Sequence, residues 1–461
     1  MKKEKVTVQA SHVIIATILV FLIFQSCQKK IEPSSEGVAS GITGKDKTNS
    51  TAMLIGSAVA TDWYKLQSRF FLGANPASNG TLNAEAFAYI GIALYEAVRP
   101  GIKNSVSLST LLYQMPAMPD ATNLGLDFTV TANAALATMV RKMYPWLSPA
   151  NKSSVDSLEN AYNNSVSLSK ESEKFNRSQS FGRAIAQAVY DWSTTDNFNV
   201  GNTGYIVPVG PGLWVPTSAA PLPVNTFVSF SRPLLQEHGG NSFIVPPPIS
   251  FSTAPSSGFY QMVKQVYEAS TTPMLTTAQR NMALFWNDQG VNVGLTPQGH
   301  MMNVVTEAIE QTGVDLGTAA QAYAKAGIAI RDAQLVLFRS KYVYNLIRPI
   351  SYIRTYIDPN YNTVIPTPNH PEYPSAHGYI TSATVRAAAW VLGNNITVVD
   401  STYKFRGAGY EPRTFSSLDA VGYESGISRL YAGIHYLPSI NVGIDYGRML
   451  GDRVGKLKLV N

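Results

Sequence analysis

The segment Lys341-Tyr-Val-Tyr-Asn-Leu-Ile-Arg348-Pro349 decides how the rest of this 461-residue sequence is interpreted. Its two cations are seven residues apart, in a run whose apolar spacing is typical of a helix. Seven residues turn a helix through about 700°, so both side chains would leave the same face, about 10 Å apart along the axis. The spacing therefore predicts two cations that can close on one anion from two sides.

A second segment, Pro374-Ser375-Ala376-His377-Gly378, precedes an Ala-rich helical pattern over residues 379–392. Pro374 suits the first turn of a helix, so the free backbone N–H groups that follow it and the Ser375 hydroxyl would point outward at a ligand. This segment predicts an anion cradle with an imidazole at its mouth.

The third segment is Ser428-Arg429-Leu-Tyr-Ala-Gly433-Ile-His435. Ser428 and His435 are again seven residues apart, and Gly433 loosens the turn beneath the histidine. The segment contributes one more cation and one more imidazole, so the three segments together predict a socket for a tetrahedral oxyanion.

The histidines and one carboxylate could instead form a divalent-metal site, made of His370, Glu372, His377 and His435. Transition metals prefer neutral imidazoles with carboxylates or thiolates, and the three cations of the segments would repel a metal ion. Few acidic residues lie near the segments in the sequence, which disfavours a purely structural salt-bridge cluster. Buried cations without partners are costly unless an anion binds.

The patterns Lys-x6-Arg-Pro, Pro-Ser-x-His and Ser-Arg-x5-His, in this order and with these spacings, resemble a known three-part signature. It is that of the superfamily shared by vanadium-dependent haloperoxidases and type 2 phosphatidic-acid-phosphatase-like acid phosphatases. The resemblance implies an all-α, helical-bundle fold with long irregular loops. Helical patterns along the chain agree with it and predict helices over 84–98, 128–143, 153–163, 171–192, 259–269, 277–288, 301–312 and 319–344.

The resemblance also implies an orthovanadate cofactor and a role for each socket residue. The vanadate oxygens would be held by Lys341, Arg348, Ser375, the Ala376 backbone N–H and Arg429, with His435 as the ligand of vanadium. His377 would be the acid–base group for hydrogen peroxide, and the substrate would be a halide, bromide or iodide rather than chloride. His370 and Phe338 are the residues predicted to line the halide pocket.

Two alternatives remain open at the level of sequence. The same residues suit an acid phosphatase without a cofactor, in which His435 attacks the phosphorus of a phosphomonoester and His377 protonates the leaving oxygen. The related lipid phosphatases are multi-pass membrane proteins, whereas this chain has no apolar run of membrane length after Phe24, which favours the peroxidase. Ser439 stands where the family commonly has an aspartate that orients the histidine, so a non-catalytic oxyanion-binding lipoprotein is the third hypothesis. Retention of His377 argues against it.

The N-terminal segment is typical of an export signal. Three lysines precede a short apolar run over 13–24, and the only cysteine, Cys27, follows a small residue. We expect a signal peptide over 1–26, a lipidated Cys27 with a flexible tether over 27–58, and a catalytic domain over 59–461. The protein would be an exported bacterial lipoprotein, anchored to a membrane at the cell envelope or outer surface.

The remaining expectations concern loops and partners. The Pro- and Gly-rich stretch 193–257 is expected to be an ordered cover with Trp214 and Phe227 as anchors. His300 is expected to serve mainly in helix entry, and His238 to lie at the surface. The formal net charge of +6 is modest and no dense Lys/Arg stripe is present, so no nucleic-acid partner is predicted.

Overall fold

The computed structural model describes residues 51–72, 80–167, 172–198, 201, 204–217, 223–240, 242–288 and 294–461. The predicted signal peptide and Cys27 lie outside these residues. The last part of the predicted tether belongs to the packed fold, because Thr51–Leu54 form the 3-10 helix η1 and Ala52 is fully buried. Nowhere in the described ranges is a helix both long and apolar enough to cross a membrane.

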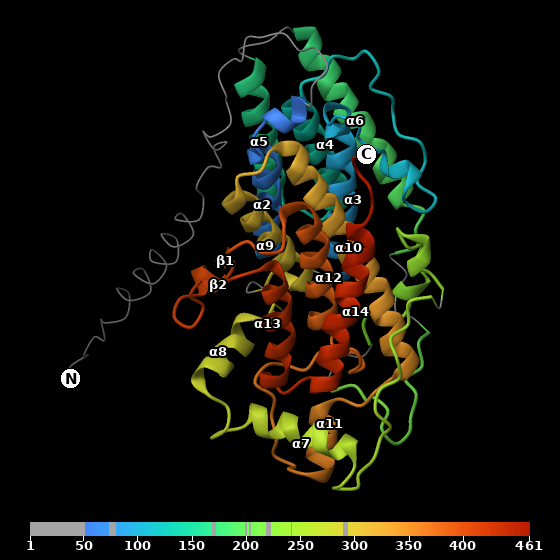
Figure 1. Ribbon diagram of the computed structural model, residues 1–461, viewed down its shortest axis with the longest axis vertical. Coiled ribbons are helices and arrows are strands. Elements are labelled where there is room, and N and C mark those ends of the chain that lie inside the picture. Colours follow the sequence, from blue (N-terminus) through green and yellow to red (C-terminus); the bar gives the residue numbers. More distant parts are fainter. Residues whose placement is uncertain are drawn as a thin grey trace, which may run out of the picture.

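The described chain is almost entirely helical, which confirms the predicted fold class (Figure 1). Its longer helices are α2 (Ala58–Leu72), α3 (Gly80–Val98), α4 (Phe128–Met143), α5 (Pro149–Ser167), α6 (Ser172–Ser193), α7 (Gly258–Ser270), α8 (Thr277–Phe285), α9 (Thr296–Thr312), α10 (Leu316–Tyr344), α11 (Pro349–Tyr356), α12 (Ala376–Leu392), α13 (Leu418–Tyr431) and α14 (Leu437–Gly455). The other 3-10 helices are η2 (Arg99–Gly101), η3 (Leu108–Thr110), η4 (Val228–Phe230), η5 (Gln236–His238) and η6 (Lys404–Arg406). The strands of the described residues are one antiparallel pair, β1 (Val398–Asp400) and β2 (Arg413–Phe415), in which Val398 pairs with Phe415.

Helix α10 runs through the middle of the molecule and connects its two halves (Figure 1). It packs against α3 of the first half and against α12 of the second. Asp315 caps its N-terminus by accepting the Thr318 N–H at 2.8 Å. A Cβ at Gly327 would lie 2.6 Å from the Phe87 carbonyl oxygen, so the close approach of α3 requires glycine there. The last turn of this helix contains Lys341.

Helices α12 and α14 pack closely because one face of α14 has glycine at every fourth position, Gly443, Gly447 and Gly451. A Cβ at Gly443 would lie 2.7 Å from the Ser375 carbonyl oxygen, and a Cβ at Gly447 would collide with that of Tyr379. The start of α14 is therefore held against the start of α12. This packing brings the third motif, which directly precedes α14, next to the second motif.

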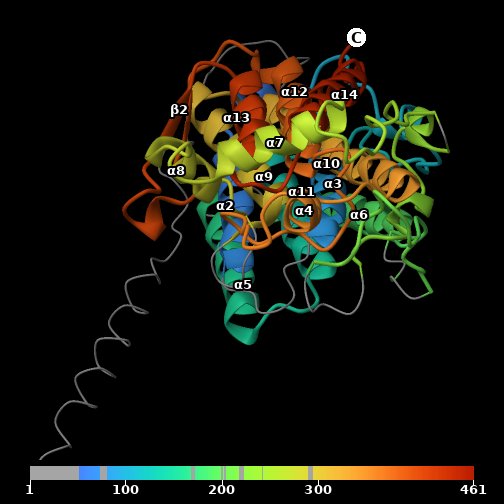
Figure 2. The same cartoon turned by 90° about the horizontal axis from the view of Figure 1, so that it is seen from below.

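Two further segments close the lower part of the molecule as seen in Figure 1. Helix α7 packs across α11, α13 and α14, which is clearest from below (Figure 2). In the 193–257 loop, Trp214 is fully buried, and its backbone N–H donates to the Asn345 carbonyl oxygen at 2.7 Å. Gly212 accepts the Ile347 N–H at 2.9 Å, so the loop is pinned to the first motif, and Trp214 is an anchor as predicted. Phe227 is only half-buried.

Candidate active site

The first motif is not a continuous helix, so the prediction that one helix carries both of its cations is wrong. Helix α10 ends at Tyr344, and Asn345 adopts a left-handed conformation with φ 45°. Arg348 has an extended backbone and precedes α11, whose first residue is Pro349. A residue before proline is disfavoured in the helical region, and asparagine tolerates the left-handed one. A turn, not a helix face, therefore places Arg348.

The Lys341 ammonium is fully buried and faces the turn that precedes α12. Its Nζ donates to the carbonyl oxygens of Pro371 at 2.9 Å, Glu372 at 2.9 Å and Pro374 at 2.7 Å. The first motif is thus bonded directly to the residues that enter the second motif.

The two guanidinium groups are bonded mainly to neutral partners. Arg348 donates from Nε to the His370 carbonyl oxygen at 2.9 Å and from NH1 to that of Ile434 at 3.0 Å. Arg429, in the last turn of α13, donates from Nε to the Ser428 Oγ at 3.0 Å. Both arginines are at most 1 % exposed. Burial and the positive charges of Arg348, Lys341 and Arg429 all lower the pKa of the His435 imidazole, so the three motifs meet in one buried cluster of cations.

The charge of this cluster is not balanced by ion pairs. In the described part of the chain, no carboxylate lies within 4.0 Å of the Lys341, Arg348 or Arg429 nitrogens. Burial lowers the pKa of Arg348 and of Arg429 to about 10, and burial together with Arg348 holds the pKa of Lys341 well below its usual range. Because a bound anion would relieve this penalty, the cluster favours an anionic ligand.

The start of α12 adds neutral donors to these cations. Ser375 is the N-cap residue, yet its side chain makes no capping bond, and its buried Oγ has no hydrogen-bond partner. The N–H groups of the first helical turn have no acceptor within the helix. An unsatisfied buried hydroxyl, a helix N-terminus and three buried cations form a donor set that fits a tetrahedral oxyanion such as phosphate or vanadate.

His435 is oriented by the carboxylate of Glu372, for which the three motifs predict no role in the socket. Its Nδ1 lies 2.7 Å from the Glu372 Oε1, which also accepts the Tyr436 N–H at 3.0 Å. Nδ1 therefore carries the ring proton, and the lone pair of the ring is on Nε2. The Arg348 NH1 lies 3.2 Å from this Nε2. Glu372 supplies the carboxylate that the family pattern places at position 439, so the serine there does not leave the His435 ring without a carboxylate partner.

The pKa of the Glu372 carboxylate is shifted in opposite directions by burial and by its neighbours. Burial raises its pKa to about 7, and the positive charges of Lys341 and Arg348 oppose that rise. Ser439 is 1 % exposed, and its hydroxyl also helps to lower the Glu372 pKa. Spacing could not reveal this partner, because Glu372 is 63 residues before His435 and the two meet only through the packing of α14 on α12.

His377 is bonded to Asp288, a residue outside the three motifs that the sequence did not indicate. Its Nε2 lies 3.0 Å from the Oδ2 of Asp288, 89 residues earlier and just after α8. Burial and the charge of Arg429 lower the His377 pKa to about 4, although Asp288 opposes them. The imidazole is therefore neutral near pH 7 and can accept a proton. A single aspartate after a helix carries no sequence signal that would have identified it.

The two residues predicted for the halide pocket lie together beside Arg348. The rings of Phe338 and His370 meet edge to face with centroids 5.2 Å apart. The Arg348 NH2 lies 3.0 Å from the His370 Nδ1. Both rings are almost completely buried, so they lie beside the Arg348 guanidinium and away from solvent.

The other two described histidines differ from expectation. His238 was predicted at the surface and is fully buried, with Nδ1 2.8 Å from the Asp332 Oδ2. His300 was predicted to serve in helix entry, but α9 begins four residues earlier, at Thr296, and the buried His300 ring bonds Asp288 and Asp400. No group of three or more His, Cys, Asp or Glu side chains in the described chain is arranged to hold a metal ion.

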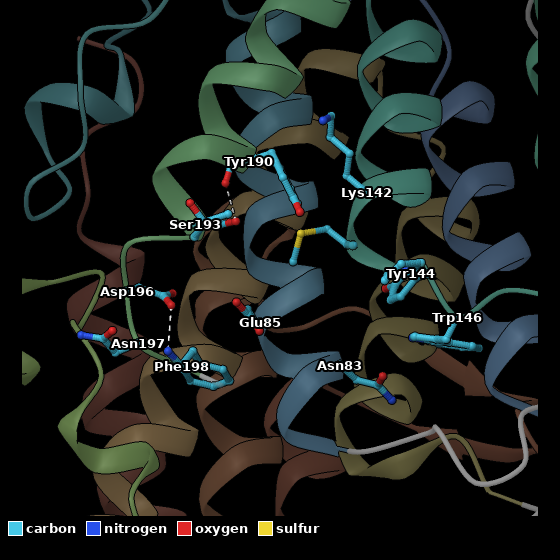
Figure 3. A pocket seen from close by; sticks show the side chains of 13 residues that line it. Asn83, Glu85, Lys142, Tyr144, Trp146, Tyr190, Ser193, Asp196, Asn197 and Phe198 are labelled. Atoms are coloured by element: carbon cyan, nitrogen blue, oxygen red, sulfur yellow. Dashed lines mark hydrogen bonds between the residues drawn. The ribbon is translucent and has the colours of Figure 1, made fainter. Parts of the chain in front are cut away.

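A cavity of about 560 Å³ lies elsewhere, between the ends of α3, α4 and α6 (Figure 3). Glu85 and Lys142 contribute charged groups to its wall, and Trp146 and Tyr190 contribute rings. Asp196, also in the wall, is paired with Arg331 at 2.7 Å. None of the socket residues lines this cavity, so it is separate from the cation cluster.

The chain is similar to known proteins in sequence and in fold. The family model described as the VCPO second helical-bundle domain matches residues 321–459. A solved structure described as the first bacterial vanadium-dependent iodoperoxidase has a TM-score of 0.79 and 27% sequence identity, covering 88% of this chain and 98% of that one. An apo-type bacterial vanadium-dependent chloroperoxidase has a TM-score of 0.62 and 16% identity, covering 83% and 95%, and so shows the fold alone. Among curated proteins, no sequence matches the chain.

Proposed function

Because the chain belongs to the vanadium-dependent haloperoxidase family, we propose that it uses vanadate to oxidise iodide or bromide with hydrogen peroxide. The observation that carries the proposal is the buried cluster of Lys341, Arg348 and Arg429 beside the unsatisfied Ser375 hydroxyl. Similarity to an iodoperoxidase over nearly the whole chain supports the choice of halide.

Each donor of the cluster has a defined task in this proposal. The oxygens of vanadate would be held by Lys341, Arg348, Arg429, the Ser375 hydroxyl and the N–H of Ala376. The Nε2 of His435 would bind the vanadium, because Glu372 fixes the ring proton on Nδ1. When bound, vanadate supplies a centre in its highest oxidation state that activates peroxide for a two-electron oxidation of halide. The surrounding cations withdraw negative charge and so favour an electrophilic oxygen.

His377 accepts a proton from hydrogen peroxide in this proposal. Its pKa of about 4 keeps the ring neutral near pH 7, and its Nε2 is held by Asp288. Proton transfer therefore uses Nδ1. His370 and Phe338 would face the halide, next to the positive charge of Arg348.

We also propose export as a lipoprotein anchored through Cys27.

The test is halide oxidation by the purified full-length protein in detergent, loaded with orthovanadate. Peroxide-dependent oxidation of iodide, bromide and chloride is measured beside hydrolysis of a small phosphomonoester. We expect vanadate-dependent oxidation of iodide or bromide, which His435→Ala abolishes. Phosphomonoester hydrolysis without halide oxidation would replace the peroxidase by the phosphatase. Tight oxyanion binding with neither activity would leave a binding protein.

A further inference from the structure

His300 is a buried histidine for which the proposed function has no task. Its ring is 0 % exposed, with Nδ1 2.7 Å from the Asp288 Oδ1 and Nε2 2.8 Å from the Asp400 Oδ2. A neutral imidazole has only one N–H donor, so one of its nitrogens would direct a lone pair at a carboxylate. Two carboxylate partners therefore require an imidazolium that donates from both nitrogens. The Trp286 ring stacks on it at 4.7 Å between centroids, a favourable contact for a buried cation.

The Asp288 carboxylate is surrounded by groups that can donate a hydrogen bond to it. The hydroxyl of Tyr403 lies 2.8 Å from its Oδ1 and accepts the Leu295 N–H at 3.1 Å, so the hydroxyl proton is directed to Asp288. His300 donates to the same oxygen. The Oδ2 is left for the His377 Nε2 at 3.0 Å. An ionised Asp288 oriented in this way can only accept, so Nε2 of His377 must carry the ring proton.

The consequence for His377 is a single tautomer. With the proton on Nε2, Nδ1 has the lone pair, and no hydrogen bond from a described residue reaches Nδ1. Asp400 completes the arrangement, because its Oδ1 accepts the Thr402 N–H at 3.0 Å and fixes the far end of the bridge.

We propose that His300 is a positioning residue for the haloperoxidase reaction: bridging Asp400 and Asp288, it holds Asp288 in the orientation that fixes the tautomer of His377. The inference rests on the proposed function, in which His377 exchanges the proton of peroxide. The charge states agree with it. Burial lowers the pKa of His300, but Asp288 and Asp400 raise it further, to about 10. Burial raises the pKa of Asp288, but His300 and His377 hold it well below its usual range.

The alternative is that His300 only joins α9 to the end of β1, and the experiment must separate the two roles. The full-length protein is labelled with ¹⁵N-histidine and compared with His300→Gln, which keeps a polar side chain of similar length but cannot carry the charge. The matched control is His238→Gln, since His238 is equally buried and bonded to Asp332 at 2.8 Å. Imidazole ¹⁵N shifts are recorded without vanadate, and kcat and vanadate affinity are measured after loading.

In the wild type we expect both nitrogens of His300 protonated near pH 7 and His377 protonated only on Nε2. In His300→Gln we expect a mixture of His377 tautomers. We also expect kcat to fall about tenfold or more, with vanadate affinity changed less than about threefold, because the vanadate-binding donors are untouched. His238→Gln should leave the His377 signals and kcat unchanged.

An unchanged His377 tautomer and unchanged kcat in His300→Gln would overturn the proposal. So would a neutral His300 in the wild type. If His300→Gln does not fold, Asp400→Asn removes one carboxylate at constant volume, and we expect a loss of one His300 proton and a lower kcat. Absence of halide oxidation by the wild type would contradict the proposed function alone, because the tautomer measurement is made without vanadate or substrate.

Discussion

The Glu372 Oε1 lies 2.7 Å from the His435 Nδ1, so a glutamate from the turn before α12 orients the imidazole that follows α13. This pair replaces the aspartate that the family pattern would place at Ser439, and it sets the direction of the His435 lone pair.

Glu372→Gln should therefore weaken vanadate binding by about ten- to a hundredfold, the usual effect of losing a carboxylate partner of a ligating histidine. Calorimetric titration of the vanadate-free protein measures it. Ser439→Asp is the companion variant. It would place a second carboxylate beside Glu372, so we expect no gain in affinity. A severalfold tighter vanadate complex in Ser439→Asp would mean that Glu372 is not the carboxylate that orients His435.

Phosphate and vanadate should compete for one site, because the donors recognise negative charge and tetrahedral shape and not the central atom. Titrating vanadate into protein saturated with phosphate should give a lower apparent affinity for vanadate. This affinity should rise again when the phosphate concentration is reduced. Independent binding of the two anions would contradict a single socket.

Arg348→Ala or Arg429→Ala should each weaken oxyanion binding by about 2 kcal/mol or more, as for a buried charge-assisted hydrogen bond. Arg141→Ala is the control, because Arg141 is bonded to Asp156 at 2.7 Å on a partly exposed face of α4, outside the socket. Wild-type affinity in both socket variants would remove these arginines from the site.

The two histidines of the socket should differ when each is replaced by alanine. His435→Ala should lose most of the vanadate affinity and all halide oxidation, since its Nε2 is the proposed ligand. His377→Ala should keep most of the affinity and lose about a hundredfold or more in kcat, since its role is proton transfer. Titrations and steady-state assays of both variants decide the matter. The reverse pattern would mean that the roles are exchanged.

The His300 bridge also predicts how stability depends on pH. The His300 pKa is raised from 6.5 in the unfolded chain to about 10 in the fold, so its stabilisation is complete below pH 6.5 and is lost as pH rises through about 10. Between these values the folded state holds one more proton than the unfolded state. The free energy of unfolding therefore falls by about 1.4 kcal/mol for each unit by which the pH rises. Glu307 titrates near the bridge with a pKa of about 7, so the useful window is pH 7.5–9.5.

Urea unfolding of the wild type and His300→Gln measures this slope. We expect the stability of the wild type, relative to that of His300→Gln, to fall as pH rises across the window, by up to that amount per pH unit. Parallel pH dependences would show that His300 gains no proton on folding.

The sequence by itself determined the helical class and the residues of the socket. Hydrophobic periodicity is a local property, so α4 was predicted with its observed bounds, and α3, α6, α7 and α10 within a few residues. The spacings within the three motifs are also local, and their resemblance to a known signature predicted Lys341, Arg348, Ser375, Arg429 and His435 as one set.

Only the tertiary structure decided which carboxylates serve that set. Glu372 reaches His435 because the glycines of α14 let it approach α12, and Asp288 reaches His377 across 89 residues of chain. The break between Lys341 and Arg348 depends equally on the loop that bonds Asn345 and Ile347. Contacts between distant segments are fixed by packing and burial, which no local pattern encodes. For that reason the sequence could specify the cations of the socket, while the protonation and orientation of its histidines followed only from the fold.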